Sequence, residues 1–318
     1  MLWFYIFIFI ISCGFLLWSG NFLVGALTRI ARFLGWKEFV VAFFIMAFAT
    51  SIPNLFVGIM SGLNKIPELS FGDVVGTNIV DLALILGLAA LISRRGLSAP
   101  SRTVQGSSIF TMAAAILPLL LVQDGILSRV DGILLLSTFL IYLSWLFHKK
   151  ERFKKVYDGV AEPLNLAPLF KDLILIFGSI LLLLFSAQGI VKSAIFFAEY
   201  LNFPIGLIGI LIIGLGTALP EASFTLHAAR KSQDWLILGN LMGSVVITAT
   251  LVLGTVALIF PIKISDFSPF FIARFFLIIA VLSFFFFIRT GHKVTKKEAL
   301  FLLGIYITFV LSEVLTSR

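Results

Sequence analysis

The sequence has few charged residues, one cysteine and three histidines. Only 13% of its 318 residues are charged and 60% are hydrophobic, whereas globular domains usually contain about 25% charged residues. Together with a mean hydropathy of +1.10, this composition excludes a soluble enzyme and an intrinsically disordered chain. Cys13 is the only cysteine and cannot form an internal disulfide, which excludes a disulfide-stabilised scaffold.

Two kinds of motif are also missing from the sequence. It has no Cys/His cluster with metal-ligand spacing, which argues against a zinc or copper site. It has no GxxxxGKS/T loop, so ATP does not drive this chain directly. We therefore expect no cofactor. The net charge of +8 does not indicate nucleic-acid binding, because the basic residues stand between long apolar runs. That pattern is typical of membrane topology.

Ten apolar segments predict an all-α integral membrane protein. A bilayer core of about 30 Å needs about 20 mostly apolar residues per helix. The segments are continuously apolar and do not alternate as the strands of a membrane barrel do. The first has no basic residues before it, so we interpret it as a retained helix. The segments span 2–28, 38–62, 69–92, 104–122, 131–147, 172–198, 204–228, 236–260, 268–288 and 299–315.

A basic linker at 148–171 separates five helices in 1–147 from five in 172–318. If this linker is cytoplasmic, 18 of the 24 Lys and Arg residues lie on the cytoplasmic side. The opposite orientation would invert that ratio, so both termini are expected outside. The absence of a large regulatory loop favours a prokaryotic plasma membrane. Membrane lipid and inorganic cations are the expected partners, and no obligate protein partner is evident.

The two halves contain a repeated pattern, and one offset of 167 residues aligns it without a gap. Between 46 and 92 this offset gives 11 identities in 47 positions. Five helices separate the copies, so the second copy is expected to be inverted across the membrane. Inverted repeats build secondary transporters whose substrate site lies at broken helices near the midplane. The matching blocks are 49–54 with 216–221, 72–77 with 239–244 and 84–87 with 251–254.

Each copy has a proline inside a membrane helix, Pro53 and Pro220. Proline cannot donate to the carbonyl four residues earlier, so we expect both helices to be broken where they line a cavity. Freed carbonyls suit Na⁺ and Ca²⁺. Further oxygen ligands stand beside these prolines, namely Thr50, Ser51, Asn54, Thr217 and Glu221.

The helix after each proline carries a polar stripe with a spacing of four residues. Residues at i, i+4 and i+8 share one helix face, so each stripe is expected to face the site. A carboxylate within an apolar run is costly unless it faces the interior with a partner, and a cation would be that partner for Asp81 and Glu221. The stripes are Asp73, Thr77 and Asp81 in the first copy, and Asn240, Ser244 and Thr248 in the second.

These blocks resemble the α-repeats of the cation/Ca²⁺ exchanger superfamily, most closely its sodium/calcium exchanger branch. The resemblance covers 39–92 and 206–259 and implies ten transmembrane helices in two inverted five-helix repeats. It places the acidic ligand pair at Asn54 and Glu221 and a second polar pair at Asp81 and Thr248. It implies hydroxyl ligands at Thr50, Thr217, Thr77 and Ser244, and carbonyl ligands at Ala47 and Gly214.

Four positions depart from the pattern of that superfamily. Asn54 replaces the first Glu, Thr248 replaces an Asn or Asp, Asp81 takes the acidic option at its position, and Asp73 replaces an Asn that Asn240 keeps. We expect Asp73, Asn240 and Asn78 to lie in a vestibule or behind the ligands. The central site then has two carboxylates, Glu221 and Asp81, which predicts exchange that is less electrogenic than is usual in the branch.

The predicted function is secondary active exchange of Na⁺ for Ca²⁺ by alternating access. A Ca²⁺/H⁺ exchanger, or an exchanger of another cation, is the first alternative, because a buried Glu can exchange protons. A cation channel on the same fold and an ion-binding homologue that does not transport are further alternatives.

Overall fold

The computed structural model describes residues 1–33, 46–148, 166–264 and 268–316, and these are helical apart from short turns and four two-residue strands. The first half contains α1 (Leu2–Phe33), α3 (Met46–Leu63), α4 (Glu68–Ile79), η2 (Val80–Ile85), α5 (Leu86–Ile92), β1 (Leu97–Ser98), α6 (Arg102–Leu121), η3 (Val122–Asp124), β2 (Ile126–Leu127) and α7 (Arg129–His148). The second half contains α8 (Leu166–Leu201), α9 (Ile205–Ile208), η4 (Gly209–Ile213), α10 (Gly214–Thr217), α11 (Leu219–Arg230), α12 (Asp234–Val246), η5 (Ile247–Val252), α13 (Leu253–Ile259), β3 (Ile262–Lys263), α14 (Ser268–Thr290), β4 (Lys293–Val294) and α15 (Lys296–Thr316).

Eight helices of the described chain are long and apolar enough to cross a membrane. They coincide with eight of the ten predicted segments. The seventh segment is a bent pair, 205–217 and 219–230, and the second corresponds to the shorter apolar helix α3. Positions 38–45 of that second segment lie outside the described residues, as do 149–165 of the predicted linker. The last six linker positions, 166–171, belong to α8.

The two predicted helix breaks have different outcomes. The second is present, because the chain bends by 43° between α10 and α11 and Pro220 occupies the first turn of α11. There a missing N–H costs nothing, since the first N–H groups of a helix have no partner within it. The first prediction is wrong: α3 continues through Pro53 without interruption. Gly214 and Gly216 precede the bend, whereas the corresponding residues of α3 are alanines, which favour helix.

The structure repeats with the same 167-residue offset as the sequence. The π-helical turns η2 and η5 begin and end at corresponding positions, as do α5 and α13. Ser128 and Asp131 form a capping box at the start of α7. Thr295 and Glu298, 167 residues later, do the same for α15. The strand pairs also correspond, because the offset converts β1–β4 into β3–β2.

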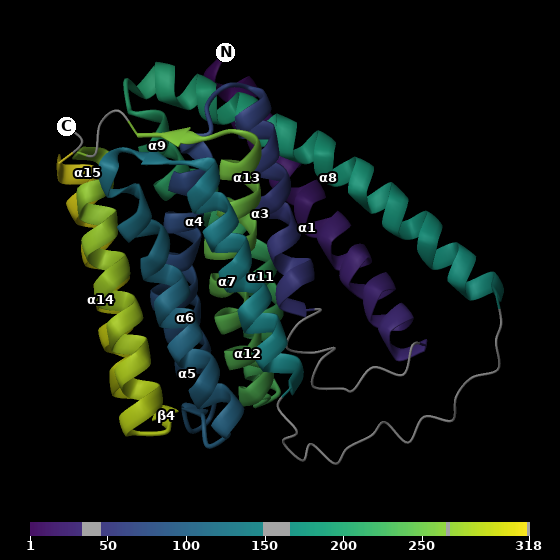
Figure 1. Ribbon diagram of the computed structural model, residues 1–318, viewed down its shortest axis with the longest axis vertical. Helices are drawn as coiled ribbons and strands as arrows, with labels where there is room; N and C mark the ends of the chain where they lie inside the picture. Colours follow the sequence, from purple (N-terminus) through teal and green to yellow (C-terminus); the bar gives the residue numbers. More distant parts are fainter. Residues whose placement is uncertain (34–45, 149–165, 265–267, 317–318) are drawn as a thin grey trace.

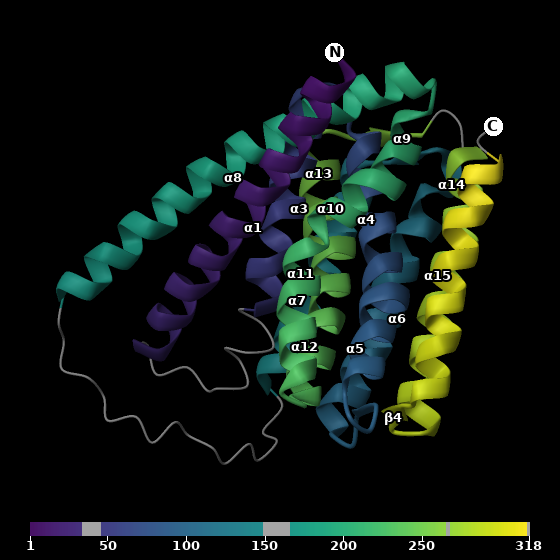
Figure 2. The same cartoon turned by 180° about the vertical axis from the view of Figure 1, so that it is seen from behind.

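The helices form an upright bundle with one inclined pair at its side. α1 and α8 pack along each other and lean away from the bundle beyond α3, in both views (Figures 1 and 2). Arg29 of α1 donates two hydrogen bonds to the carboxylate of Asp172 of α8, at 2.6 and 2.9 Å. The first residue of α1 and the last turn of α15 lie at the same end of the molecule (Figure 1).

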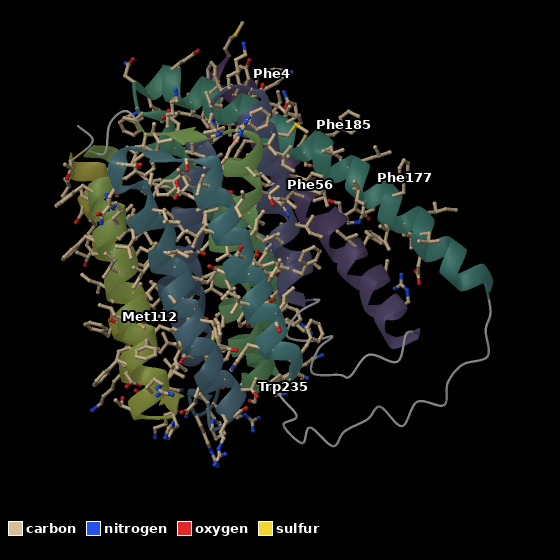
Figure 3. The ribbon with its side chains drawn as sticks, viewed as in Figure 1. Phe4, Phe56, Met112, Phe177, Phe185 and Trp235 are labelled. Atoms are coloured by element: carbon tan, nitrogen blue, oxygen red, sulfur yellow. The ribbon has the colours of Figure 1, made fainter. Side chains whose placement is uncertain are left out.

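The outer surface of the inclined pair is aromatic. Phe4 of α1 and Phe177 and Phe185 of α8 project away from the bundle (Figure 3), and Phe185 is 75% exposed. A ring so exposed on a helix that is apolar all round fits a lipid environment. The centre of the bundle is different: 78% of the spans 68–92 and 234–259 is buried. These two helical rods therefore form the interior.

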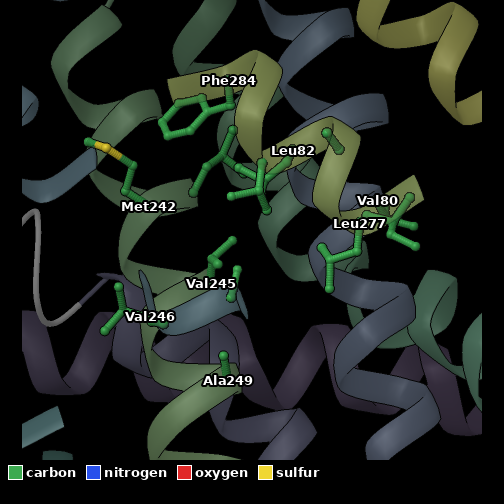
Figure 4. Close-up of a cluster of buried hydrophobic side chains, with 14 of the residues drawn as sticks. Val80, Leu82, Met242, Val245, Val246, Ala249, Leu277 and Phe284 are labelled. Carbon is green, nitrogen blue, oxygen red and sulfur yellow. The ribbon is translucent and has the colours of Figure 1, made fainter. Parts of the chain in front are cut away.

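The apolar interior is divided into two clusters. One packs α1 and α8 against α3, α9 and η4. The larger one joins α4–α7 with α11–α15, and Figure 4 shows the part of it where the central rods meet α14. The side chains labelled there are Val80, Leu82, Met242, Val245, Val246, Ala249, Leu277 and Phe284. The polar residues of the predicted site lie between apolar layers of this kind.

Candidate cation-binding site

The predicted site residues are buried inside the bundle on four rods. α3 carries the first proline block, α4 and η2 the first stripe, α10 and α11 the second proline block, and α12 and η5 the second stripe. Thr50 is 3% exposed and Asn78 1%, and the remaining polar members are inaccessible to solvent. Those inaccessible side chains are Ser51, Asn54, Asp73, Thr77, Asp81, Thr217, Glu221, Asn240, Ser244 and Thr248.

One group of these residues, the first half-site, consists of Asn54, Asp73, Thr77, Thr217 and the carbonyl of Gly214. The amide nitrogen of Asn54 lies 3.3 Å from Asp73 Oδ2, 3.1 Å from Thr77 Oγ1 and 3.0 Å from Thr217 Oγ1. Thr217 Oγ1 donates to Asp73 Oδ1 at 2.6 Å. Gly214 O lies 3.2 Å from Thr77 Oγ1 and 3.4 Å from Thr217 Oγ1. Both repeats therefore contribute to this half-site.

The second half-site consists of Glu221, Asn240, Ser244, Thr50 and Ser51, and it is built in the same way. Ser244 Oγ donates to Glu221 Oε1 at 3.3 Å. Thr50 Oγ1 lies 3.4 Å from Asn240 Oδ1, and Ser51 Oγ lies 3.4 Å from Ser244 Oγ. Each pair corresponds to a pair of the first half-site at the 167-residue offset, apart from Ser51, whose counterpart is Ala218. The carbonyl of Ala47 accepts from Thr50 and Ser51, at 3.2 and 2.8 Å.

Asp81 extends the second half-site from the opposite repeat. Its carboxylate lies close enough to Glu221 for the two charges to repel each other. Within the described chain, neither oxygen of Asp81 has a hydrogen-bond partner, and Glu221 Oε2 and Asn54 Oδ1 also have none. Buried charges without partners are strongly unfavourable. These oxygens therefore fit a cation as their missing partner.

Asp81 and its counterpart Thr248 both stand in π-helical turns, η2 and η5. Such turns are rare and occur frequently at functional sites. Thr248 does not reach a carboxylate. Its hydroxyl donates to Asn78 Oδ1 at 2.7 Å, so these two residues bridge the central rods. The π-helical turns could not be predicted from the apolar pattern, which reads the same in α- and π-helix.

Close helix approach holds the two repeats together beside the first half-site. A Cβ atom on Gly76 would overlap the backbone carbonyl of Ile210, and one on Gly72 would overlap that of Gly206. A Cβ on Gly214 would lie 2.8 Å from the Thr77 backbone nitrogen. Glycine is therefore needed for α4 to pack against η4 and α10 at this distance, as expected for small residues at membrane helix interfaces.

Two positions differ from the sequence-based expectation of a vestibule or outer layer. Asp73 and Asn240 lie within the two half-sites and hydrogen-bond directly to predicted ligands. Their helix-start location suggested a peripheral place, and only the packing of α4 against α10 shows otherwise. Sequence reasoning also missed Thr225, whose hydroxyl accepts from Asn240 Nδ2 at 3.4 Å. Its spacing of four residues after Glu221 was the available signal.

The chemistry of this region is that of a hard-cation site. Its donors are carboxylate, amide, hydroxyl and carbonyl oxygens, which Ca²⁺ prefers, with ligand distances of 2.3–2.6 Å. In the described chain the only salt bridge, Arg29–Asp172, is elsewhere, and no three His, Cys, Asp or Glu residues gather as a metal cluster. An oxygen-lined, acidic site buried between membrane-spanning helices defines an integral membrane cation transporter.

Comparison with known proteins identifies the kind of transporter. The sequence profile described as "Sodium/calcium exchanger protein" matches residues 4–148 and 171–314, so the chain belongs to the sodium/calcium exchanger family. This is a family of exchangers and not of enzymes. The expectation from the proline blocks and stripes is thereby confirmed at the level of the family.

Two curated relatives and a solved structure agree with this membership. The chain is 26% identical to the sodium/calcium exchanger MaX1 of Methanosarcina acetivorans, over 95% of this chain and 96% of that one. It is 26% identical to the inner membrane protein YrbG of Escherichia coli, over 80% of each. Its fold superimposes on that of the sodium-calcium exchanger NCX_Mj with a TM-score of 0.68 at 25% identity, covering 98% of this chain and 99% of the other.

Proposed function

We propose that this protein is a secondary active antiporter that exchanges Na⁺ for Ca²⁺ by alternating access. The observation that carries the proposal is the pairing of Asp81 with Glu221. Both are inaccessible to solvent, and three of their four oxygens have no hydrogen-bond partner in the described chain. Two adjacent carboxylates match the charge of one Ca²⁺ ion. The exchanged cations are the substrates, and the chain needs no cofactor.

The membrane arrangement we propose is ten helices in two inverted five-helix halves, 1–147 and 172–318, joined by the linker 148–171. The 167-residue recurrence of the π-helical turns, capping boxes and strand pairs supports the two halves. The strand pairs support the inversion, because β4 lies at the lower end of the bundle whereas β3 follows α13 at the upper end (Figure 1). The five helices between the repeats also require it.

Alternating access would come from movement of the α1–α8 pair against the remaining bundle. This pair has its own apolar cluster and leans outward from the bundle (Figure 2). The Arg29–Asp172 ion pair ties its two helices together. The two helices would therefore move as one body, while the four rods that carry the ligands stay packed through the larger cluster.

The protein would lie in a prokaryotic plasma membrane, surrounded by lipid, with both termini outside. The distribution of Lys and Arg between alternate loops supports this orientation. The location of the chain ends at one end of the bundle is consistent with an even number of spans (Figure 1). The likeness to an inner membrane protein of Escherichia coli supports the location.

Uptake of ⁴⁵Ca²⁺ into proteoliposomes tests the proposed function. Vesicles would be prepared with an outward Na⁺ gradient, an outward H⁺ gradient or no gradient, and Glu221→Gln would serve as the inactive control. The proposal predicts uptake driven by Na⁺ and lost in the variant. Uptake driven only by H⁺ would assign the chain to proton-coupled exchange. Single-channel currents would identify a channel, and binding without transport would identify a non-transporting homologue.

A further inference from the structure

The two repeats place one carboxylate and one amide in opposite order. In the second repeat the carboxylate is Glu221 on α11 and the amide is Asn240 on α12. At the positions 167 residues earlier, the amide is Asn54 on α3 and the carboxylate is Asp73 on α4. The first repeat has therefore kept its negative charge and moved it to the neighbouring helix.

The geometry shows that the moved charge stays in the same place in space. Asn54 and Asp73 are in contact, with 3.3 Å between Nδ2 and Oδ2. Asp73 also faces the threonine that its position requires, since Thr217 donates to its Oδ1 at 2.6 Å. In the second half-site the corresponding Thr50 lies 3.4 Å from Asn240 Oδ1. A carboxylate at position 73 thus reaches the same half-site as a carboxylate at position 54.

The oxygens around Asp73 are spaced like the coordination shell of a small hard cation. In an octahedral shell at about 2.4 Å, neighbouring oxygens lie about 3.4 Å apart. Thr77 Oγ1 lies 3.4 Å from Asp73 Oδ1 and 3.2 Å from Gly214 O, and Gly214 O lies 3.4 Å from Thr217 Oγ1.

A second observation indicates a ligand at this cluster. Asn54 Oδ1 belongs to the same half-site, is inaccessible to solvent, and has no hydrogen-bond partner in the described chain. The amide nitrogen of the same side chain meets three oxygens of the cluster. A buried amide oxygen without a partner is unfavourable, and a cation beside Asp73 would satisfy it.

We propose that Asp73 is the anionic cation ligand of the first half-site, and that this half-site takes a monovalent hard cation, Na⁺. The assignment rests on the proposed function and specifies its ligands. One carboxylate matches one Na⁺, whereas Asp81 and Glu221 together match Ca²⁺. The binding region then holds three carboxylates, so the electroneutral exchange expected from two carboxylates is no longer favoured.

The test moves the charge back along the chain. Asp73→Asn keeps the side-chain size and removes the charge, and Asn54→Glu/Asp73→Asn gives the first repeat the order that the second repeat has. Asp124→Asn, at an exposed turn, is the matched control. Purified full-length protein in detergent is titrated with NaCl against choline chloride, and separately with CaCl₂, while its melting temperature is recorded. A ligand that binds the folded state raises that temperature.

The proposal predicts that Asp73→Asn raises the Na⁺ concentration for half-maximal stabilisation at least about tenfold and leaves stabilisation by Ca²⁺ in place. The double variant recovers Na⁺ stabilisation, and Asp124→Asn behaves as the wild type. An unchanged Na⁺ titration in Asp73→Asn would overturn the proposal. So would loss of both Na⁺ and Ca²⁺ stabilisation without recovery in the double variant, because Asp73 would then be structural.

Failure of this inference differs from failure of the proposed function. If the wild type carries no ⁴⁵Ca²⁺ under any gradient, the proposed exchange fails, while the Na⁺ titrations still decide the role of Asp73. If the wild type exchanges Na⁺ for Ca²⁺ and Asp73→Asn exchanges with the same Na⁺ dependence, only the inference about Asp73 fails.

Discussion

At the residue scale, the identities of the site residues could be predicted, but their grouping could not. The repeat and the polar stripes singled out Asp81, Glu221 and their neighbours, because carboxylates inside apolar runs are rare and costly. The grouping depends on which helices touch across the bundle. Asp73 joins Thr217 only because Gly72 and Gly76 let α4 approach η4 and α10, and spacing along one helix carries no information on that contact.

Replacing Asp81 by Asn should separate function from stability. The charge of Asp81 has no hydrogen-bond partner in the described chain, so removing it relieves an unfavourable burial. We expect Ca²⁺ uptake to fall at least about tenfold, while the melting temperature without Ca²⁺ stays equal or rises. Glu199→Gln, on the exposed end of α8, is the control. Undiminished uptake would contradict a ligand role, and a lower melting temperature would indicate a structural one.

The two site threonines should differ in their contribution to stability. Thr217 donates to a carboxylate at 2.6 Å, whereas Thr50 lies 3.4 Å from an amide oxygen. Hydrogen bonds to charged groups contribute about 1.5–3 kcal/mol and neutral ones about 0.5–1.5 kcal/mol. Thr217→Val should therefore lower the melting temperature more than Thr50→Val, measured in detergent without Na⁺ or Ca²⁺. Equal losses would show that Asp73 is uncharged or differently placed.

At the element scale, the helices could be predicted from apolar runs, but their local geometry could not. All ten predicted segments correspond to helices over their described parts. The bend after Thr217 was predicted, and the interruption at Pro53 was wrong. Proline occurs in both places, so proline alone did not decide the outcome. The glycines before the bend differ from the alanines of α3, and glycine lowers the cost of leaving helical geometry.

The close approach of α4 to η4 gives a prediction at this scale. A Cβ atom on Gly76 would overlap the carbonyl of Ile210, whereas Gly304 of α15 has no atom within 4 Å of such a position. Gly76→Ala should therefore destabilise the protein by about 1–3 kcal/mol through overpacking and reduce Ca²⁺ uptake. Gly304→Ala should keep both. Thermal unfolding and ⁴⁵Ca²⁺ uptake measure the pair, and equal behaviour would contradict the described packing.

At the scale of the whole molecule, the inverted halves give each end of the bundle an equivalent strand pair. β1 pairs with β4 and β2 with β3, through Leu97↔Val294 and Ile126↔Lys263. The offset exchanges these pairs, so each connects a turn of one half to a turn of the other. The sequence repeat predicted the symmetry, but the strands themselves are too short to be recognised from alternation.

The proposed orientation can be tested by labelling single cysteines in intact cells. Cys13 is replaced by Ser, and Gln123→Cys and Lys231→Cys are introduced separately at exposed turns. A membrane-impermeant maleimide should label position 123 in intact cells and position 231 only after permeabilisation. The opposite pattern would place both termini inside, and labelling of both positions in intact cells would contradict the proposed arrangement of spans.

Simultaneous measurement of two fluxes tests most directly whether one buried site exchanges Na⁺ for Ca²⁺. Proteoliposomes are loaded with ²²Na⁺ and placed in ⁴⁵Ca²⁺, and efflux and uptake are followed together in wild type and Glu221→Gln. Coupled exchange predicts that each flux requires the other ion and that the variant loses both. Independent fluxes, or a variant with undiminished exchange, would contradict the account.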